Sequence, residues 1–321
     1  MLRLSVNKMG GCKDKKHRRI IAAAIVIALL AAAAVAVHLT TGTFRSAKPS
    51  KYGLDEELSM AFSNADEVVD AVRAGLVSHA SSIHISCRAG GQYMDDISPL
   101  VDGIMEAAQQ ETESPVEGDY IRYQLGGYTN KYSCTKFLWW YKYEITIIPE
   151  YYTYAYQEEW VDEKVAEIME SFGFSPYTSD AEKVAAVYEY VMNTVQYDEV
   201  HLHNKKYHKK ATAYAALKNG RAVCQGYSVL MYRLLREAGV GCRVITGDAI
   251  ASDGTSEYHS WNIVCIDGLW YNLDATWDSL LCCGDYYLKC DESIQDHVRS
   301  EEFACEEFYR AYPMAQQDYM Q

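Results

Sequence analysis

The feature that most constrains the fold is a helix followed by a β-hairpin in the C-terminal half of the chain. Cys224 stands directly before an apolar pattern at helical spacing, and this pattern ends at Gly239, a residue type that commonly terminates helices. Two strand-like runs follow, 258–266 and 269–277, and Asp267-Gly268 separates them. An Asp-Gly pair between such runs predicts a tight turn. The sequence therefore predicts a helix and an antiparallel hairpin.

The turn also predicts the register of the hairpin. If Ile266 faces Leu269, counting back along both strands places His259 and Asp274 on the same face as diagonal neighbours. A bulge at the turn would shift the register by one residue and send the two side chains to opposite faces. With the register kept, the Asp274 carboxylate holds the His259 imidazole.

Cys224, His259 and Asp274 are the residue types that thiol acyl transfer needs. The predicted helix N-terminus favours the Cys224 thiolate, which is the reactive form. A histidine acts as the base beside it, and an acidic residue fixes the imidazole tautomer. A single cysteine is more often a small buried hydrophobe, and a single histidine is often a core residue. The occurrence of all three in predicted proximity favours a catalytic site.

The surroundings of these residues resemble the core of the transglutaminase-like superfamily. The resemblance is greatest to bacterial transglutaminase/protease-like proteins related to cytokinesis proteins. It rests on Ala213-Tyr214-Ala215-Ala216-Leu217, Val223-Cys224-Gln225-Gly226-Tyr227-Ser228, His259-Ser260-Trp261-Asn262 and Trp270-Tyr271-Asn272-Leu273-Asp274-Ala275-Thr276-Trp277-Asp278. It implies a papain-like thiol core, in which a helix bearing the cysteine packs on an antiparallel sheet bearing the histidine and aspartate. It also implies Cys224 as nucleophile, His259 as base and Asp274 as orienter.

The resemblance indicates the chemistry more closely than the substrate, because the superfamily includes transglutaminases, peptidases, deamidating or deglycosylating enzymes and inactive members. We expect a membrane-anchored cysteine acyltransferase or hydrolase that acts on protein or peptide amides through a thioester. The alternative is a catalytically silent surface binding or scaffold module that keeps the fold. Candidates for substrate binding or for an oxyanion donor are Tyr214, Gln225 and Trp261, although packing alone also accounts for Trp261.

The N-terminus predicts where this chemistry takes place. Residues 1–19 contain seven Lys or Arg and one Asp, and residues 20–37 form an uncharged run of eighteen apolar residues. Because such a run is long enough to span a bilayer, we predict a signal-anchor at 20–39 with residues 1–19 in the cytoplasm and the catalytic part outside. A cleaved secretory signal is the alternative, since Ala34-Val35-Ala36 resembles a cleavage site.

Charge limits the class of partner. The whole chain has a net charge of −14, and residues 1–19 contribute +6, so the remainder carries −20. Such an acidic chain without a basic stripe is a poor match for nucleic acid, and we expect a protein or peptide substrate, with cell-wall peptide as one candidate. A merely soluble acidic surface is the other interpretation. We expect no cofactor and no metal, because no phosphate-binding glycine loop, cofactor fingerprint or metal-ligand spacing is present.

The chain outside the anchor divides into a stalk and two modules in this prediction. Residues 40–60 are the stalk, 61–178 form a smaller α/β module and 179–321 form the catalytic domain, so the fold class is α+β. Within the first module, alternating side chains at 139–147 predict a strand with one buried face. Residues 173–178 contain Gly173 and Pro176 and mark the boundary. Ser179 and Glu182 form a capping-box pattern that opens the next helix.

Ten cysteines are present. Cys12 is predicted to be cytoplasmic and Cys224 must stay free, so eight remain that can form up to four bridges outside the membrane. We expect a bridge first in the C-terminal cluster of Cys282, Cys283, Cys290 and Cys305.

Overall fold

The computed structural model describes residues 57–61, 65–90, 96–138 and 140–320, which fall into two compact units. The first unit holds the described residues up to Leu76 together with Ala80–Ala108 and Tyr128–Pro149. The second holds Val77–His79, Gln109–Gly127 and the chain from Glu150 onward.

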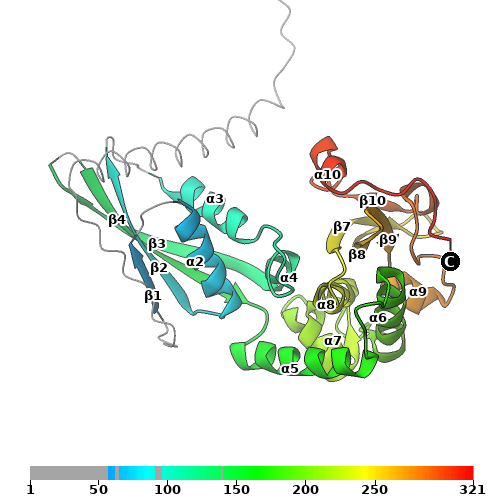
Figure 1. Cartoon of the computed structure of the whole chain (residues 1–321). Coiled ribbons are helices and arrows are strands. Elements are labelled where there is room, and N and C mark those ends of the chain that lie inside the picture. The colour runs from blue at the N-terminus through cyan, green and yellow to red at the C-terminus, as the bar shows by residue number, and fades with distance from the viewer. Residues whose placement is uncertain (1–56, 62–64, 91–95, 139, 321) are drawn as a thin grey trace, which may run out of the picture. The chain divides into compact units, whose positions relative to one another are not determined.

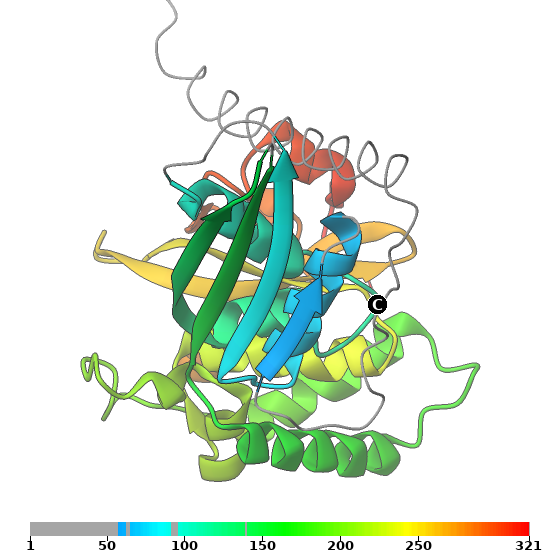
Figure 2. The ribbon, with the colours of Figure 1, turned by 90° about the vertical axis from the view of Figure 1, so that its left-hand side faces the viewer.

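The first unit is a mixed sheet with two helices on one face (Figure 1). Its strand order is β1-β2-β4-β3, in which β1 runs parallel to β2 and β2 runs antiparallel to β4. Figure 2 shows the strands in front of both helices. The elements are β1 (Glu57–Ala61), α2 (Ala65–Val77), β2 (Ser82–Gly90), α3 (Ser98–Ala108), β3 (Leu125–Lys136) and β4 (Trp140–Tyr151).

The alternation predicted at 139–147 is confirmed in the described part of β4. Tyr143, Ile145 and Ile147 are buried, whereas Glu144 is exposed. Successive strand residues point to opposite faces, so one apolar face lies against the helices.

The second unit packs helices against an antiparallel sheet of order β10-β7-β8-β9. Helix α8 contacts β7 and β8 and also α4, α5, α6 and α7. The elements are α4 (Asp119–Gln124), α5 (Ala155–Phe172), α6 (Asp180–Thr194), β5 (Gln196–Tyr197), η1 (His208–Ala211), α7 (Ala213–Asn219), β6 (Arg221–Ala222), α8 (Cys224–Glu237), β7 (Cys242–Ile250), β8 (Ser256–Ile266), β9 (Leu269–Leu273), α9 (Ala275–Leu281), η2 (Asp291–Ser293), β10 (His297–Arg299) and α10 (Glu306–Ala311). The predicted α+β class is confirmed.

The helix predicted after Cys224 is confirmed at both ends. It begins at Cys224, its C-cap is Ala238, and Gly239 follows with a φ of 79°. Eleven of its fourteen residues are buried. A helix that is buried on nearly all sides forms the centre of a core rather than a surface layer, and α8 accordingly supplies much of the larger hydrophobic core.

The predicted hairpin is correct at its turn and too long in its second strand. Ile266 pairs with Leu269, and Asp267 and Gly268 have φ values of 52° and 83°, as a turn with two left-handed residues requires. The strand ends at Leu273, however, and residues 275–281 form helix α9. The predicted strand at 274–277 is therefore wrong, because the Asp274 side chain accepts backbone N–H groups and starts a helix there.

The boundary between the two compact units does not lie at the predicted position, residues 173–178. Gln109–Gly127 and α5, which we assigned to the first module, belong to the second unit. Tyr120 and Val161 lie in the same core as α8, so burial of apolar surface joins these segments to it. The capping box that opens α6 is confirmed, since Ser179 and Glu182 bond each other's backbone N–H groups.

Two further predictions concern the membrane and the cysteines. The predicted anchor at 20–39 and residues 40–56 of the predicted stalk at 40–60 lie outside the described residues, and no helix among the described residues is long and apolar enough to cross a bilayer. The end of the predicted stalk, 57–60, is wrong, because these residues pair with β2 as part of β1. The predicted C-terminal bridge is not formed, because the four cysteines of that cluster are free thiols. Cys134, Cys242 and Cys265 are free as well.

Candidate active site

Cys224 is the first residue of α8, and its side chain is only 8% exposed. The first N–H groups of a helix have no partner within the helix, so the thiol lies at the positive end of the helix dipole. Gly226 allows this turn to pack tightly, since a Cβ there would lie 2.5 Å from the Cβ of Ala222 and 3.0 Å from the Lys210 carbonyl oxygen. A larger side chain at this position would therefore push the first turn of α8 away from Ala222 and Lys210.

His259 connects the thiol to the carboxylate. It lies in β8 opposite Gly247 of β7 and is buried. Its Nε2 is 2.7 Å from Asp274 Oδ2, and Cys224 and Asp274 both favour its charged form. Since Nε2 faces the carboxylate, Nδ1 is left for the sulfur. The structure thus brings together the three residues that the sequence singled out.

Asp274 holds the imidazole from the N-cap position of α9 rather than from a strand. Its Oδ1 accepts the backbone N–H groups of Thr276 and Trp277 at 2.8 and 3.2 Å. Its Oδ2 is left for the imidazole of His259. The helix cap therefore fixes the carboxylate, and the carboxylate fixes the ring.

Electrostatics favour the ionised forms of all three groups. Burial alone would raise the pKa of Cys224, but the hydrogen bond and charge of His259, together with Ser260, lower it from its ordinary value. Burial disfavours the charged imidazole, yet the Asp274 carboxylate outweighs this and raises the pKa of His259 to about 10. The pKa of Asp274 is lowered despite its burial, chiefly by the His259 charge. The site therefore favours the thiolate–imidazolium pair over the neutral pair.

Two residues at the site were not found by sequence reasoning. Ser260 helps to lower the pKa of Cys224, and its hydroxyl lies 3.4 Å from that of Ser228. His297 in β10 places Nε2 at 3.1 Å from Asp274 Oδ2. Ser260 lies inside the His-Ser-Trp-Asn motif, so its proximity was a signal, whereas His297 belongs to none of the motifs quoted above.

The three candidates for substrate binding or for an oxyanion donor have different surroundings. Trp261 is buried and donates its only N–H to Asn272 Oδ1 at 3.2 Å, so its indole is not free to stabilise an oxyanion. Gln225 donates from its side-chain amide to the Tyr123 carbonyl oxygen at 2.6 Å. Tyr214 packs edge-on against Trp160, with ring centroids 5.5 Å apart.

Among the described residues one group could hold a metal ion, and it overlaps the triad. His259, Asp274 and His297 each offer one ligand atom, and these atoms lie within 4.8 Å of one another. Both imidazoles already lie at hydrogen-bond distance from the same oxygen of Asp274. Hydrogen bonds therefore account for this arrangement without an ion.

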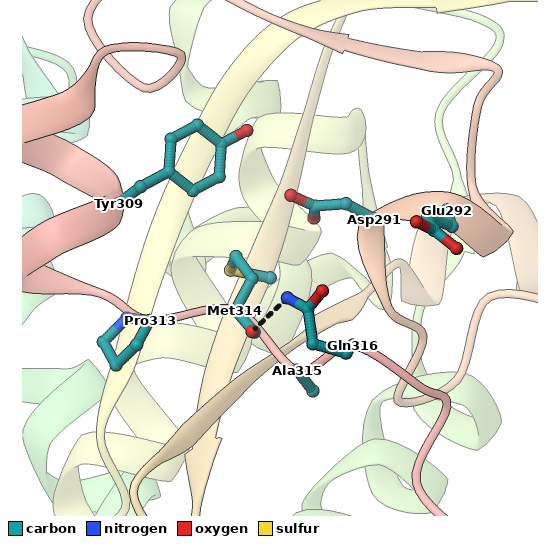
Figure 3. Close-up of a pocket in the computed structure, with 7 residues that line it drawn as sticks. All are labelled: Asp291, Glu292, Tyr309, Pro313, Met314, Ala315 and Gln316. Atoms are coloured by element: carbon teal, nitrogen blue, oxygen red, sulfur yellow. Dashed lines mark hydrogen bonds between the residues drawn. The ribbon is translucent and has the colours of Figure 1, made fainter.

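A separate surface pocket of about 390 Å³ lies near the C-terminus and is shown in Figure 3. Asp291, Tyr309 and Gln316 are among its lining residues, and none of the three proposed catalytic residues is. In it the Gln316 side chain donates to the Met314 carbonyl oxygen at 3.3 Å. The pocket is therefore distinct from the thiol site.

Comparison with known proteins places the thiol site in a characterised type of domain. Residues 171–275 match the family described as the Transglutaminase-like superfamily, and this segment contains Cys224, His259 and Asp274. Over 108 residues the chain is 30% identical to the Kyphoscoliosis peptidase of Mus musculus and 28% identical to that of Homo sapiens. Each alignment covers 32% of this chain and 16% of the relative, so the chain spans less than a fifth of the length of these proteins.

A solved structure of a TGase matches with a TM-score of 0.30 and 16% sequence identity, over 60% of this chain and 51% of that chain. The family match and the observed helix-on-sheet arrangement agree. The chain contains a transglutaminase-like domain.

Proposed function

We propose that this domain is a thiol enzyme that attacks protein or peptide amides and carries the acyl group as a thioester on Cys224. One observation carries the proposal: at a helix N-terminus, the imidazole of His259 lies 2.7 Å from the carboxylate of Asp274 and beside the thiol of Cys224, whose pKa it lowers. Nucleophile, base and orienter are thus neighbours. A small buried cysteine that served only for packing would need neither partner.

The geometry supports a two-step reaction. The Cys224 thiolate attacks the amide carbonyl carbon, and the His259 imidazolium gives its proton to the departing amine, so the C–N bond breaks and the thioester forms. Water or a primary amine then attacks the thioester while His259 accepts its proton, and the C–S bond breaks to restore the thiolate. Asp274 keeps the imidazole oriented through both steps.

The oxyanion of each tetrahedral intermediate needs a donor near the sulfur. We propose the backbone N–H of Cys224 for this role, because it lies at the start of α8, where helix N–H groups have no intrahelical partner. Gln225 and Tyr214 stay candidates for a second donor. The N–H of Trp261 is committed to Asn272, so we propose a packing role for that indole beside the imidazole.

The setting of the reaction is part of the proposal. The basic residues 1–19 and the apolar run at 20–37 support a single-pass anchor with the catalytic domain outside the cytoplasm. An extracytoplasmic domain of this kind would meet secreted proteins or cell-wall peptides as substrates. The motif resemblance supports placement in the branch related to cytokinesis proteins.

One observation favours the alternative of a silent binding or scaffold module, namely the burial of Cys224. Cys224 is only 8% exposed, which leaves little room for a large acyl donor. The enzyme requires that substrate reach the sulfur, whereas the scaffold requires only that the fold be kept. Access of a substrate to Cys224 therefore distinguishes the enzyme from the scaffold module.

The test is product analysis with the full chain and its Cys224→Ala variant. Each is incubated with casein, with and without a dansylated primary amine, and peptides are read by mass spectrometry. Amine incorporation at glutamine indicates transamidation, new termini indicate peptidase activity and conversion of glutamine to glutamate indicates hydrolysis. A thioester adduct on the Cys224 peptide supports the enzyme. Identical products from wild type and Cys224→Ala would refute it in favour of the scaffold.

A further inference from the structure

The Asp274 carboxylate receives two imidazoles rather than the one that a triad needs. His259 Nε2 and His297 Nε2 lie 2.7 and 3.1 Å from the same oxygen, Oδ2. The other oxygen accepts the two backbone N–H groups that begin α9. Four N–H groups therefore surround one buried carboxylate, and the two imidazoles compete for one atom.

His297 is held on its far side by a second carboxylate. Its Nδ1 is 2.9 Å from Asp296 Oδ1, and Tyr286 donates its hydroxyl to Asp296 Oδ2 at 2.6 Å. Ionised carboxylate oxygens only accept hydrogen bonds, so the contacts on both sides of His297 favour the ring form in which both nitrogens carry protons. The side chain of His297 is fully buried, and in that form it is a second cation beside the triad.

The position of this ring is fixed by its strand. His297 opens β10, which pairs with β7 so that Arg299 lies opposite Gly247. A Cβ on Gly247 would come within 2.0 Å of the Val298 carbonyl oxygen, so only glycine lets β10 approach this closely. The indole of Trp261 packs edge-on against the His297 ring at 5.0 Å between centroids. Backbone pairing and packing thus hold the second imidazole at the triad.

We propose that His297 is a positioning residue that shares the Asp274 carboxylate with His259 and thereby weakens the hold of His259 on its proton. The inference rests on the proposed function. Two cations whose ring centroids are 5.4 Å apart repel each other, and each takes part of the attraction that one carboxylate oxygen exerts. His259 then gives its proton more readily to the leaving amine than it would with Asp274 to itself.

Other titratable groups near the two rings do not account for the same effect. They include Cys224, Asp274, Asp296, Tyr188, Tyr197, Tyr227, Tyr258 and Tyr286. Burial raises the pKa of these tyrosines, so they stay neutral through the neutral range. None of these groups is a cation.

The test measures the pH dependence of Cys224 modification by iodoacetate in the full chain. The reagent is an anion that the His259 imidazolium attracts, so the rate falls at the pH where His259 loses its proton. In His297→Gln the side-chain amide still donates to Asp274 but carries no charge. We expect the falling limb of the pH–rate profile, where the modification rate decreases, to move to higher pH by about 0.5–1 unit in this variant. His84→Gln, in β2 of the first unit, is the matched control and should leave the limb in place.

Three outcomes would overturn the inference. A falling limb at the same pH in wild type and His297→Gln, with Cys224 still selectively modified, refutes the role of His297 and leaves the proposed function standing. Stoichiometric zinc in the wild-type chain that is lost in His297→Gln would show that the three side chains are metal ligands instead. A wild-type Cys224 that iodoacetate does not modify selectively refutes the proposed function and this inference with it. Thermal unfolding of His297→Gln checks that the variant is folded.

Discussion

Two buried thiols in the second unit have opposite electrostatic environments. Cys224 opens helix α8 and Cys242 opens strand β7, and both are shielded from solvent, at 8% and 1% exposure. The pKa of Cys224 is lowered although burial opposes this, because His259 lies beside it. The pKa of Cys242 is raised well above its ordinary value by burial and by the nearby Asp119 carboxylate.

The difference shows that burial does not decide whether a cysteine is reactive. A buried thiol becomes a thiolate only where a cation and hydrogen-bond donors offset the loss of water. At Cys224 the helix N-terminus, His259 and Ser260 provide them. At Cys242 the sulfur receives a weak 3.6 Å contact from Asn262, and Asp119 disfavours negative charge.

The largest expected effect comes from removing the cation. In His259→Ala, modification of Cys224 by iodoacetamide at pH 6 should slow severalfold or more, since loss of the imidazolium raises the pKa of Cys224 and lowers its thiolate fraction. Peptide mass spectrometry against time gives the rate for each cysteine. Cys242 should not change, and His84→Ala in the first unit serves as control. An unchanged Cys224 rate in His259→Ala would remove the basis of the comparison.

The acidic surroundings of Cys242 predict a pH-dependent stability. Glu111 accepts the Asp119 backbone N–H at 2.6 Å and the Tyr232 hydroxyl at 2.9 Å. Burial and the Asp119 charge raise the pKa of Glu111 from 4.5 to about 7, although Arg243 opposes this. The folded state therefore holds a proton that the unfolded chain loses above pH 4.5, so the free energy of unfolding should fall as pH rises through this interval.

Glu111→Gln tests this, because glutamine keeps the shape and cannot titrate. Ionisation of Glu111 should lower the wild-type free energy of unfolding by about 1–3 kcal/mol between pH 5 and pH 8. The Glu111→Gln variant should not show this decrease. Urea unfolding at a series of pH values measures it. If both proteins show the same slope, Glu111 does not carry the proton. Cys224 reactivity at pH 6 should be alike in both.

Asp274 should have two separable roles, as a helix cap and as the partner of His259. Asp274→Ala should lower the free energy of unfolding by about 1 kcal/mol from the lost cap, and by about 1–3 kcal/mol more because the buried His259 and His297 lose their acceptor. Ser179→Ala, which removes the exposed cap of α6, is the control for the cap alone and should cost about 1 kcal/mol. Only Asp274→Ala should also slow Cys224 modification. Equal Cys224 rates in the two variants would contradict the orienting role.

The smallest expected effect is at Cys242. Cys242→Ala should lower the free energy of unfolding by about 0.5–1 kcal/mol, because it removes one buried atom and leaves a small void. Amide hydrolysis or transfer should continue at the wild-type rate. Cys224→Ala should show the reverse, with stability nearly kept and turnover lost. A turnover defect in Cys242→Ala would mean that the two regions are coupled.

Local rules predicted those parts of the site that depend on neighbours in sequence. The Asp-Gly turn set the hairpin register, the apolar spacing set both ends of α8, and Ser179 with Glu182 set the start of α6. The strand predicted at 274–277 failed because its composition suits a strand while one side-chain cap starts a helix. Contact between His259 and Asp274 was predicted, but the position of Asp274 as the N-cap of α9 was not.

Other features depend on contacts that no local pattern encodes. His297 reaches Asp274 across 23 positions through the pairing of β10 with β7, and no motif marks it. Tyr120 joins the core of α8 because its ring is buried beside it and its hydroxyl bonds Glu158. Domain membership of residues 109–127 therefore follows from burial of apolar surface, which sequence spacing cannot locate.

The pH dependence of Cys224 modification by iodoacetamide tests most directly whether its environment favours the thiolate despite burial. The full chain is treated across pH 5 to 10, and each cysteine is compared by the pH at which its rate is half its maximum, so that differences in access do not enter. We expect the half-maximal pH of Cys224 to lie well below that of Cys242 and below the ordinary thiol value of 9.0. A half-maximal pH for Cys224 at or above 9.0, rising together with Cys242, would contradict it.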